Sequence, residues 1–227
     1  MSVIFFDIGA TLADARMEPD GSLTLQARPR VMALLDALRG VREGIISNPG
    51  PGNGAAARAE AALHETFPGR FMEEALVHWG VKDSRRIFDE AVASTGAAAD
   101  ECVFVGEDAQ ERAFAREAGM RTAAHPVFAF AALESRTVHR SRIELQEGPG
   151  PAELTAAVDE AEAVVVQIVS EQLALVMVTM RGAEALNHAG FRVHVRGPVD
   201  ETAAVPNRDD QAVSAPDALA DAPHEAP

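Results

Sequence analysis

Residues 3–12 read Val-Ile-Phe-Phe-Asp-Ile-Gly-Ala-Thr-Leu, an apolar run that leads directly into a carboxylate. Four consecutive apolar residues are typical of a strand in a parallel sheet, because such a strand is covered on both faces and has no solvent side. Asp7 follows the run and enters a turn that contains Gly9. Ligands of open α/β sheets bind outside the carboxyl ends of the strands. The stretch therefore predicts an α/β fold with a candidate site at Asp7.

Two further segments have the same form. Residues 44–46 are apolar and precede Ser47, and residues 102–106 end in a glycine that precedes Glu107. Helical segments separate these strands, and a connecting helix returns the chain to the same edge of a sheet through a right-handed crossover. The strands are therefore expected to run parallel in one sheet, with Asp7, Ser47 and Glu107 at a common edge.

Lys82 is the only lysine among the 20 lysines and arginines of the chain. It precedes residues 83–88, Asp-Ser-Arg-Arg-Ile-Phe, which lead into a predicted helix. A compact ammonium group can pair with a carboxylate and with phosphoryl oxygens where the bulkier guanidinium does not substitute. A single lysine can also be incidental, but its place in the order of the other segments favours a role in the site.

In this order, the Asp7 turn, Ser47, Lys82 and Gly106-Glu107-Asp108 resemble motifs I to IV of the haloacid-dehalogenase-like (HAD) superfamily, most of whose members are phosphatases. The resemblance implies a Rossmann-like three-layer fold with a central parallel sheet, and it makes Asp7 the nucleophile. The candidate catalytic residues are then Asp7, Ser47 and Lys82, and the candidate phosphate-binding residues are Ser47, Asn48 and Lys82. The implied cofactor is Mg²⁺, which prefers oxygen ligands and retains several waters. Its candidate ligands are Asp7, the Gly9 carbonyl, Glu107 and Asp108.

The chain departs from the family pattern at two positions. Gly9 stands where the family has a second aspartate that acts as general acid and base, and Arg112 stands near the second acid of motif IV. Attack by Asp7 on phosphorus needs no side chain at position 9, but proton transfer typically contributes about 10²–10⁴ in rate. We therefore expect a slow phosphatase, a substrate with a good leaving group, or a proton donor from elsewhere, for which Asp14 is a candidate.

The spacing after motif I leaves little room for a substrate-covering cap. Residues 14–25 fit at most a small hairpin with Asp20-Gly21 as its turn, before a helix that starts near Pro29. The site is therefore expected to be of the capless type, open to large substrates or covered by a partner subunit. Family members that break carbon–halogen bonds without a metal lack an acidic pair at motif IV, so Glu107-Asp108 argues against that branch.

Composition limits which partners and which cellular location the sequence predicts. The 227 residues carry a formal net charge of -15 at pH 7, which argues against binding to a nucleic-acid backbone, since that needs clustered Lys and Arg. No stretch reaches the ~20 apolar residues of a membrane span, and no signal peptide is recognised because Asp7 interrupts the first apolar run. A cytoplasmic protein without a membrane contact is therefore expected. Cys102 is the single cysteine and falls in a predicted buried strand, where we expect an inert core residue.

The second half of the chain lies outside the family resemblance. We expect a HAD-like core over residues 1–133, a polar connector over 134–160, a ββαβ unit over 161–198 and a tail without regular structure over 199–227. Two apolar runs, a short helix closed by Gly190 and an alternating strand indicate the ββαβ unit. The unit is too small to bury its own sheet faces, so it is expected to dock on the core or on a second copy.

Two functions remain open from the sequence. The first is a Mg²⁺-dependent HAD phosphatase that forms an aspartyl-phosphate at Asp7 and acts on a phosphorylated substrate. The second is a catalytically impaired HAD-fold module that binds a protein partner, or a second copy, through its C-terminal unit. Arg192, His194 and Arg196 face outward on the last strand and could contact an anionic partner, although a solvated face is the commoner situation. The set of candidate site residues favours the enzyme, whereas Gly9 and Arg112 favour the binding module.

Overall fold

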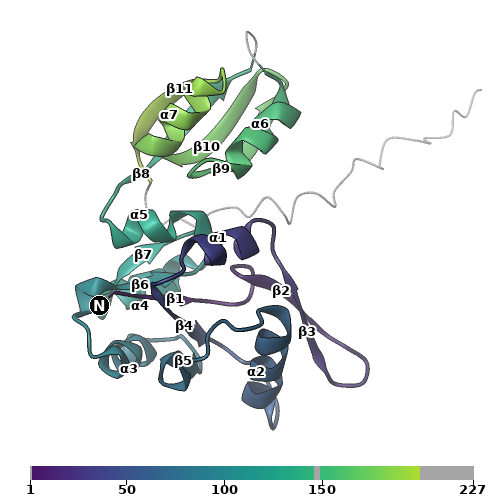
Figure 1. The fold of residues 1–227 in the computed structure, drawn as a ribbon, viewed down its shortest axis with the longest axis vertical. Coiled ribbons are helices and arrows are strands. Elements are labelled where there is room, and N and C mark those ends of the chain that lie inside the picture. The colour runs from purple at the N-terminus through teal and green to yellow at the C-terminus, as the bar shows by residue number, and fades with distance from the viewer. Residues whose placement is uncertain (1, 146–148, 200–227) are drawn as a thin grey trace, which may run out of the picture.

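The computed structural model describes residues 2–145 and 149–199. Figure 1 shows two parts: a larger one built around a five-stranded sheet, and a smaller one above it that contains β8 to β11. Within the described residues, every helix is too short or too polar to cross a membrane.

A parallel sheet forms the centre of the larger part. Its strand order is β5-β4-β1-β6-β7, and every neighbouring pair is parallel. The strands are β1 (Val3–Phe6), β4 (Arg42–Ser47), β5 (Val77–Trp79), β6 (Cys102–Val105) and β7 (Arg121–Ala123). All four residues of the central strand β1 are buried, as the uninterrupted apolar run predicts. The predicted α/β fold with a central parallel sheet is therefore confirmed.

Helices cover both faces of this sheet and complete three layers. The helices are α1 (Val31–Ala37), α2 (Ala55–Thr66), α3 (Arg86–Thr95), α4 (Ala109–Glu117) and α5 (Ala129–Leu133). Short 3-10 turns precede β5, β6 and α5: η1 (Glu74–Leu76), η2 (Ala99–Glu101) and η3 (Pro126–Phe128). Because side chains alternate along a strand, Phe6 packs in one cluster with α1, α2 and α5, whereas Phe5 packs in another with α3 and α4.

A two-stranded hairpin follows motif I, as predicted. Its strands are β2 (Ala13–Met17) and β3 (Leu23–Ala27). Gly21 adopts a φ of 84° at the turn, and Asp20 accepts a hydrogen bond from the Ser22 amide. The Thr66 hydroxyl donates to the Leu25 carbonyl, so α2 holds the second strand of the hairpin.

The smaller part contains more than the predicted ββαβ unit. It consists of β8 (Val138–Glu144), α6 (Pro151–Asp159), β9 (Ala163–Ser170), β10 (Leu173–Thr179), α7 (Met180–His188) and β11 (Arg192–Pro198). The sheet is antiparallel with the order β11-β8-β10-β9. This β-α-β-β-α-β topology is that of ferredoxin-like folds.

The interpretation of residues 134–160 as a connector was wrong, because β8 and α6 lie within them. β8 was missed because its exposed face carries charged side chains, so that its sequence looks polar throughout. It lies in the sheet interior, between β11 and β10, which come later in the chain. The predicted tail lies outside the described residues except for Val199, whose amide donates to the Val138 carbonyl.

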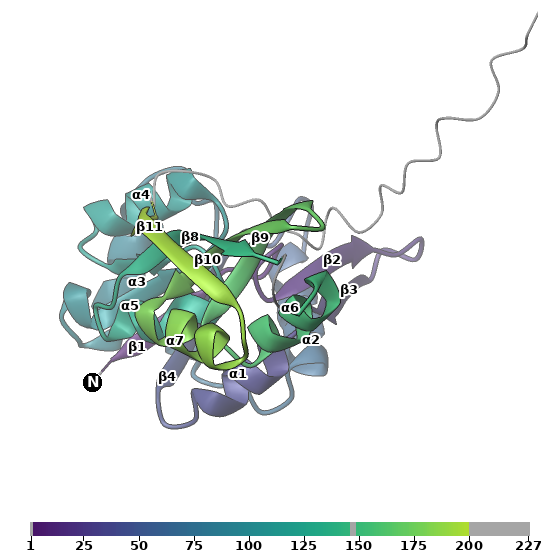
Figure 2. The same ribbon diagram turned by 90° about the horizontal axis from the view of Figure 1, so that it is seen from above.

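The two parts are in direct contact. Met177 of β10 is buried in the same apolar cluster as Phe128 and the α1 side chains of the larger part. Arg30, just before α1, donates to the carbonyls of Ala161 and Ala163 at 2.7 and 2.9 Å. Figure 2 shows the smaller sheet lying over the larger part. The smaller part therefore docks on the core, one of the two arrangements expected for it.

Candidate functional site

Asp7 is the centre of the candidate site. It continues β1, where its amide donates to the Val105 carbonyl of β6 at 2.9 Å, and it is only 6% exposed. Its Oδ1 accepts a hydrogen bond from the Ser47 hydroxyl at 2.8 Å and lies 2.6 Å from Lys82 Nζ. Three of the predicted residues, which come from three different strand ends, therefore meet at one oxygen atom.

The Lys82 ammonium is buried and shared between two carboxylates. Its side chain is 2% exposed, and Nζ lies 2.7 Å from Glu111 Oε2 as well as 2.6 Å from Asp7 Oδ1. The ammonium also lies 5.6 Å from the centre of the Phe104 ring, within the range of a cation–π contact. The loop that carries Lys82 is joined to Ser47, because the Gly80 amide donates to the Ser47 carbonyl at 3.0 Å.

Sequence reasoning missed Glu111. It looked for a second motif IV acid near position 112 and found Arg112, whereas the acid is Glu111, four residues after Glu107. Glu111 lies in the first turn of α4, which begins at Ala109, directly after the loop that carries Glu107. An acid in the first helical turn after that loop was the signal that could have identified it.

Three carboxylates at this site affect one another electrostatically. Burial is the main cause that raises the pKa of Glu107, and the charge of Asp7 raises it further. Burial raises the pKa of Glu111 to about 7, against the opposing effect of Lys82. Glu107 Oε2 accepts a hydrogen bond from the Thr11 hydroxyl at 2.9 Å, which connects motif I to motif IV. The site therefore holds more negative charge than one ammonium offsets.

Arg112 supports the loop that bears Glu107. It is fully buried, and its Nη1 donates to the carbonyls of Gly106 and Glu107, each at 2.7 Å. Gly106 itself is required for close packing, because a Cβ there would lie 2.9 Å from the Phe104 ring and 3.6 Å from Asp7 Cβ. The arginine that seemed to weaken the site in the sequence thus holds its backbone in place.

Three predicted or alternative residues have other contacts. Asp108 is the N-cap of α4, where its Oδ1 accepts from the amides of Gln110 and Glu111. Asn48 is exposed, and its Oδ1 accepts from the Gly50 amide in a local turn. Asp14 lies on the hairpin, 3.6 Å from Arg28. In the described part of the chain, no hydrogen bond or ion pair joins any of the three to Asp7.

Gly9 leaves free space. No atom lies within 4 Å of the position that a Cβ would occupy, and its φ lies outside the left-handed region. The absence of a side chain at this position is therefore not required by packing. A Cβ could be added there without displacing a neighbour.

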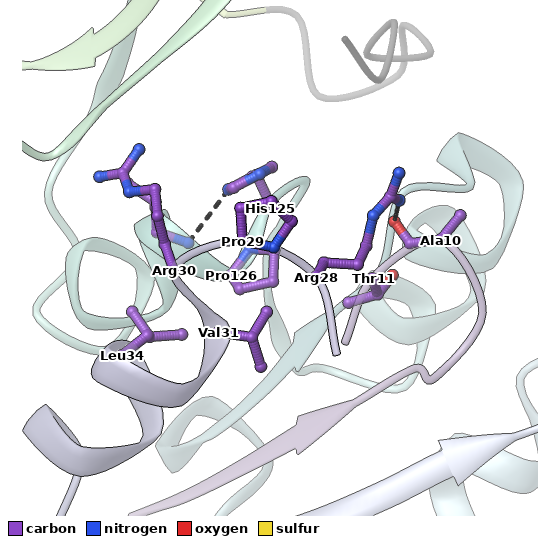
Figure 3. Close-up of a pocket in the computed structure, with 10 residues that line it drawn as sticks. Ala10, Thr11, Arg28, Pro29, Arg30, Val31, Leu34, His125 and Pro126 are labelled. Atoms are coloured by element: carbon purple, nitrogen blue, oxygen red, sulfur yellow. Dashed lines mark hydrogen bonds between the residues drawn. The ribbon is translucent and has the colours of Figure 1, made fainter. Parts of the chain in front are cut away.

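A pocket lies next to the motif I loop, residues 7–12 (Figure 3). Its polar lining comes from Ala10 and Thr11 of that loop, Arg28 and Arg30 before α1, and His125 before η3. Burial, together with the charges of Arg30 and Arg28, lowers the pKa of His125 to about 3. Nδ1 of the neutral His125 ring accepts a hydrogen bond from the Val127 amide, so the ring proton is on Nε2. The two arginines already donate to backbone carbonyls, Arg28 to that of Ala10 and Arg30 to those of Ala161 and Ala163, so the lining is held by internal hydrogen bonds.

The residues around Asp7 fit a hard divalent cation by their chemistry. Within residues 2–145 and 149–199, no group of three or more His, Cys, Asp or Glu side chains is arranged as a preformed metal site. Mg²⁺ does not need one, since it is commonly held by one or two carboxylates, waters and substrate oxygens. The mutual repulsion of Asp7, Glu107 and Glu111 would be relieved by a cation.

No protein-family model and no curated protein matches the sequence. Solved structures do resemble it. One is 3-deoxy-D-manno-octulosonate 8-phosphate phosphatase from Moraxella catarrhalis in complex with magnesium, phosphate and KDO, with 16% identity over 49% of this chain and 60% of that chain and a TM-score of 0.36. Another is the cobalt-bound enzyme of the same name from Haemophilus influenzae, with 13% identity over 54% and 67% of the two chains and a TM-score of 0.38.

A third similar structure is described as a HAD superfamily (subfamily III A) hydrolase from Legionella pneumophila, with 16% identity over 48% of this chain and 56% of that chain and a TM-score of 0.35. The match covers about half of this chain and 60% of the Moraxella enzyme.

Proposed function

We propose that this protein is a capless, Mg²⁺-dependent phosphatase of the HAD superfamily that uses Asp7 as its nucleophile. The observation that carries the proposal is the position of Asp7 Oδ1, which contacts both Lys82 and Ser47. A buried ammonium and a hydroxyl at one carboxylate oxygen hold the side chain in a fixed orientation. The other oxygen, Oδ2, accepts no hydrogen bond from the described residues and is the atom we assign to attack.

In the first step, Asp7 Oδ2 forms a bond to phosphorus while the bond from phosphorus to the ester oxygen breaks. The departing oxygen takes the bonding electrons and a proton. In the second step, water attacks phosphorus, the aspartyl bond breaks, and inorganic phosphate leaves. Lys82, whose ammonium has three N–H donors, donates to the phosphoryl oxygens. We assign the Ser47 hydroxyl, once it turns from Asp7 to the substrate, and the Asn48 amide as further donors. Such donors act chiefly by stabilising charge that develops in the transition state.

A bound Mg²⁺ would neutralise part of the negative charge on the phosphoryl oxygens. Asp7, the Gly9 carbonyl and Glu107 are the groups we assign to hold it, while Asp108 caps α4 with one of its oxygens. Glu111 keeps Lys82 between two carboxylates. Because Gly9 offers no acid, the proton for the leaving oxygen comes from solvent in this scheme. We therefore expect slow turnover and a preference for substrates with good leaving groups, acting in the cytoplasm.

Trapping the phosphoenzyme tests the nucleophile. Incubation with an activated aryl phosphate should label the protein at Asp7, and mass spectrometry of the digested protein should locate the phosphate there. Asp7→Asn should abolish labelling and hydrolysis, because an amide is not a nucleophile at phosphorus. Asp14→Asn is the matched control and should be labelled like the wild type. If no phosphate ester labels or is hydrolysed, the chain is a binding module on a HAD scaffold.

Thermal unfolding tests the metal. A ligand that binds only the folded state raises stability by mass action, so the melting temperature should increase with Mg²⁺ concentration. Glu107→Gln should weaken the increase, whereas Asp108→Asn, which retains a capping oxygen, should leave it unchanged. A melting temperature that does not respond to millimolar Mg²⁺ would argue against the metal while leaving the assignment of Asp7 to be decided by the labelling experiment.

A further inference from the structure

The second face of the C-terminal sheet is only partly covered. Helices α6 and α7 pack on one face, where Ser141 and Ile143 of β8 are buried. The alternate residues of that strand, Arg140 and Arg142, point to the other face. Part of that face contacts the larger part through Met177, and Val138, Val164 and Val166 are partly buried against the same cluster. Among the described residues, Arg140 and Arg196 on the remaining part of the face are exposed.

A groove of about 610 Å³ lies on this face. Its cationic wall consists of Arg140, Arg142 and Arg196, and its apolar wall of Val166, Leu173 and Leu175. Leu175 is 38% exposed and lies directly across from Arg142 in the sheet. Clefts of about 300–1,000 Å³ with an apolar lining and a few polar groups are typical of small-molecule sites. The groove has both the size and the mixed chemistry of such a site.

Few carboxylates offset the positive charges of the three arginines in the groove. In the described part of the chain, no carboxylate lies within ion-pair distance of Arg140 or Arg196. Arg142 Nη2 contacts Glu144 at 3.0 Å, but its Nε is buried without a hydrogen-bond partner. The whole chain carries 35 acidic residues against 20 basic ones. Three neighbouring arginines in such an acidic chain produce a local positive potential that selects anions.

Of the three outward-facing residues predicted on the last strand, Arg192, His194 and Arg196, only Arg196 lines the groove. Arg192 and His194 lie 3.8 and 3.4 Å from Glu144. The structure therefore narrows the anion-attracting surface from the outer strand to the groove itself.

Gly197 keeps the groove open. It pairs across the sheet with Arg140, and no atom lies within 4 Å of the position that a Cβ would occupy. Its φ lies outside the left-handed region, so a larger residue is sterically allowed and would project into open space. The glycine gives a way to fill the groove without disturbing the fold.

We propose that this groove binds a small organic anion, with its charged group on Arg140, Arg142 and Arg196 and an apolar body against Val166 and Leu175. Charge complementarity favours an anion, and the apolar wall favours an organic ligand over an inorganic ion. This site is separate from Asp7 and does not depend on the phosphatase assignment.

Titration with anilinonaphthalene sulfonate, an aryl sulfonate whose fluorescence rises in apolar sites, tests the proposal on the full chain. One saturable site is expected, and Arg140→Gln with Arg196→Gln should weaken binding by about tenfold or more, because charge-assisted hydrogen bonds are lost. Gly197→Val should reduce binding by filling the groove. Arg86→Gln, at an exposed arginine on α3, removes one positive charge outside the groove and should have no effect. Phenylnaphthylamine, which lacks the sulfonate, should bind more weakly and be insensitive to the arginine changes.

Three results would overturn the proposal. Equal affinity of the probe for the double arginine variant and the wild type would show that it binds elsewhere. Inorganic phosphate displacing the probe at low concentration would show an ion site without an apolar part. Sedimentation that shows a dimer whose dissociation is needed for probe binding would identify the face as an interface between copies. The exposed arginine variants keep the test valid even if Gly197→Val fails to fold.

Discussion

At Asp7, a single oxygen atom receives two donors. Ser47 and Lys82 both contact Oδ1, and Lys82 is held in turn by Glu111 at 2.7 Å. A buried charge is costly unless it is paired, and here the ammonium has two carboxylate partners. Lysine fits this position because its charge is compact, whereas a guanidinium would need more space between the two carboxylates. Removal of either carboxylate would leave the ammonium with one partner.

Gly9→Asp should increase turnover of an alkyl phosphate more than that of an activated aryl phosphate. An alkyl leaving group needs a proton, and an acid at position 9 can supply it, with a gain of up to ~10²–10⁴. The position that a Cβ would occupy at Gly9 is free of neighbouring atoms. Steady-state kinetics with matched alkyl and aryl esters measure the effect, and Gly9→Asn is the control that fills the same space without an acid. Equal gains for both esters, or for both variants, would contradict an acid role.

At the scale of elements, short segments position groups that are distant in sequence. Helix α4 contributes a cap from Asp108, an acid from Glu111 and a backbone-supporting side chain from Arg112. The turn η3 similarly depends on the residue before it. His125 is its N-cap, and the ring accepts the Val127 amide while facing the cations Arg28 and Arg30.

His125 should make the protein sensitive to acid. Its pKa is about 3 in the folded protein, below the ordinary value of 6.5, so the unfolded chain takes up the proton first as the pH falls. Its stabilising contribution is therefore complete above pH 6.5 and is lost as the pH falls toward 3. His125→Asn, which keeps a capping acceptor without a titrating ring, should reduce the loss by at most ~1.4 kcal/mol per pH unit.

Urea unfolding of wild type and His125→Asn between pH 4 and 7 measures this difference. Because the carboxylates titrate in both proteins, the comparison isolates the histidine. The control His188→Asn, at an exposed position near the end of α7, should follow the wild type. Parallel stability curves for His125→Asn and wild type would show that the ring is not buried as a neutral base.

At the scale of the whole molecule, one arginine joins the two sheets. Arg30 donates to two carbonyls at the start of β9, and its Nε lies 3.7 Å from Asp159 at the end of α6. The buried Met177 adds an apolar contact in the same interface. The parallel sheet and the antiparallel sheet are therefore connected by both a polar and an apolar contact.

Arg30→Met should loosen this connection. The methionine retains much of the apolar stem, so the loss is mainly that of two charge-assisted hydrogen bonds, with an expected cost of about 1–3 kcal/mol. Hydrogen exchange should increase at residues 159–166 more than in β1. Arg39→Met removes an exposed arginine whose hydrogen bond is to Asp36, three residues away, and should leave exchange unchanged. Uniform protection in Arg30→Met would show that the apolar contact alone holds the two parts together.

The sequence by itself determined the central sheet and three members of the site. The run at residues 3–6 could only be a strand covered on both faces, and the polar residues at the strand ends had to meet because parallel strands share one carboxyl edge. Asp7 and Ser47 were found from this local pattern, whereas Lys82 was found because it is the only lysine and stands in order with the other segments. Gly9 was also read from the sequence, although only the structure revealed the free space beside it.

Tertiary structure alone decided the rest. Whether Glu111 or Arg112 reaches Lys82 depends on where α4 begins, since adjacent helical residues point about 100° apart. β8 was recognisable only from β10 and β11, because an exposed face of charged residues hides a strand whose other face is buried. The groove between Arg140 and Arg196 likewise joins residues that are far apart in the chain. Contacts between distant segments are set by packing, and no local pattern records them.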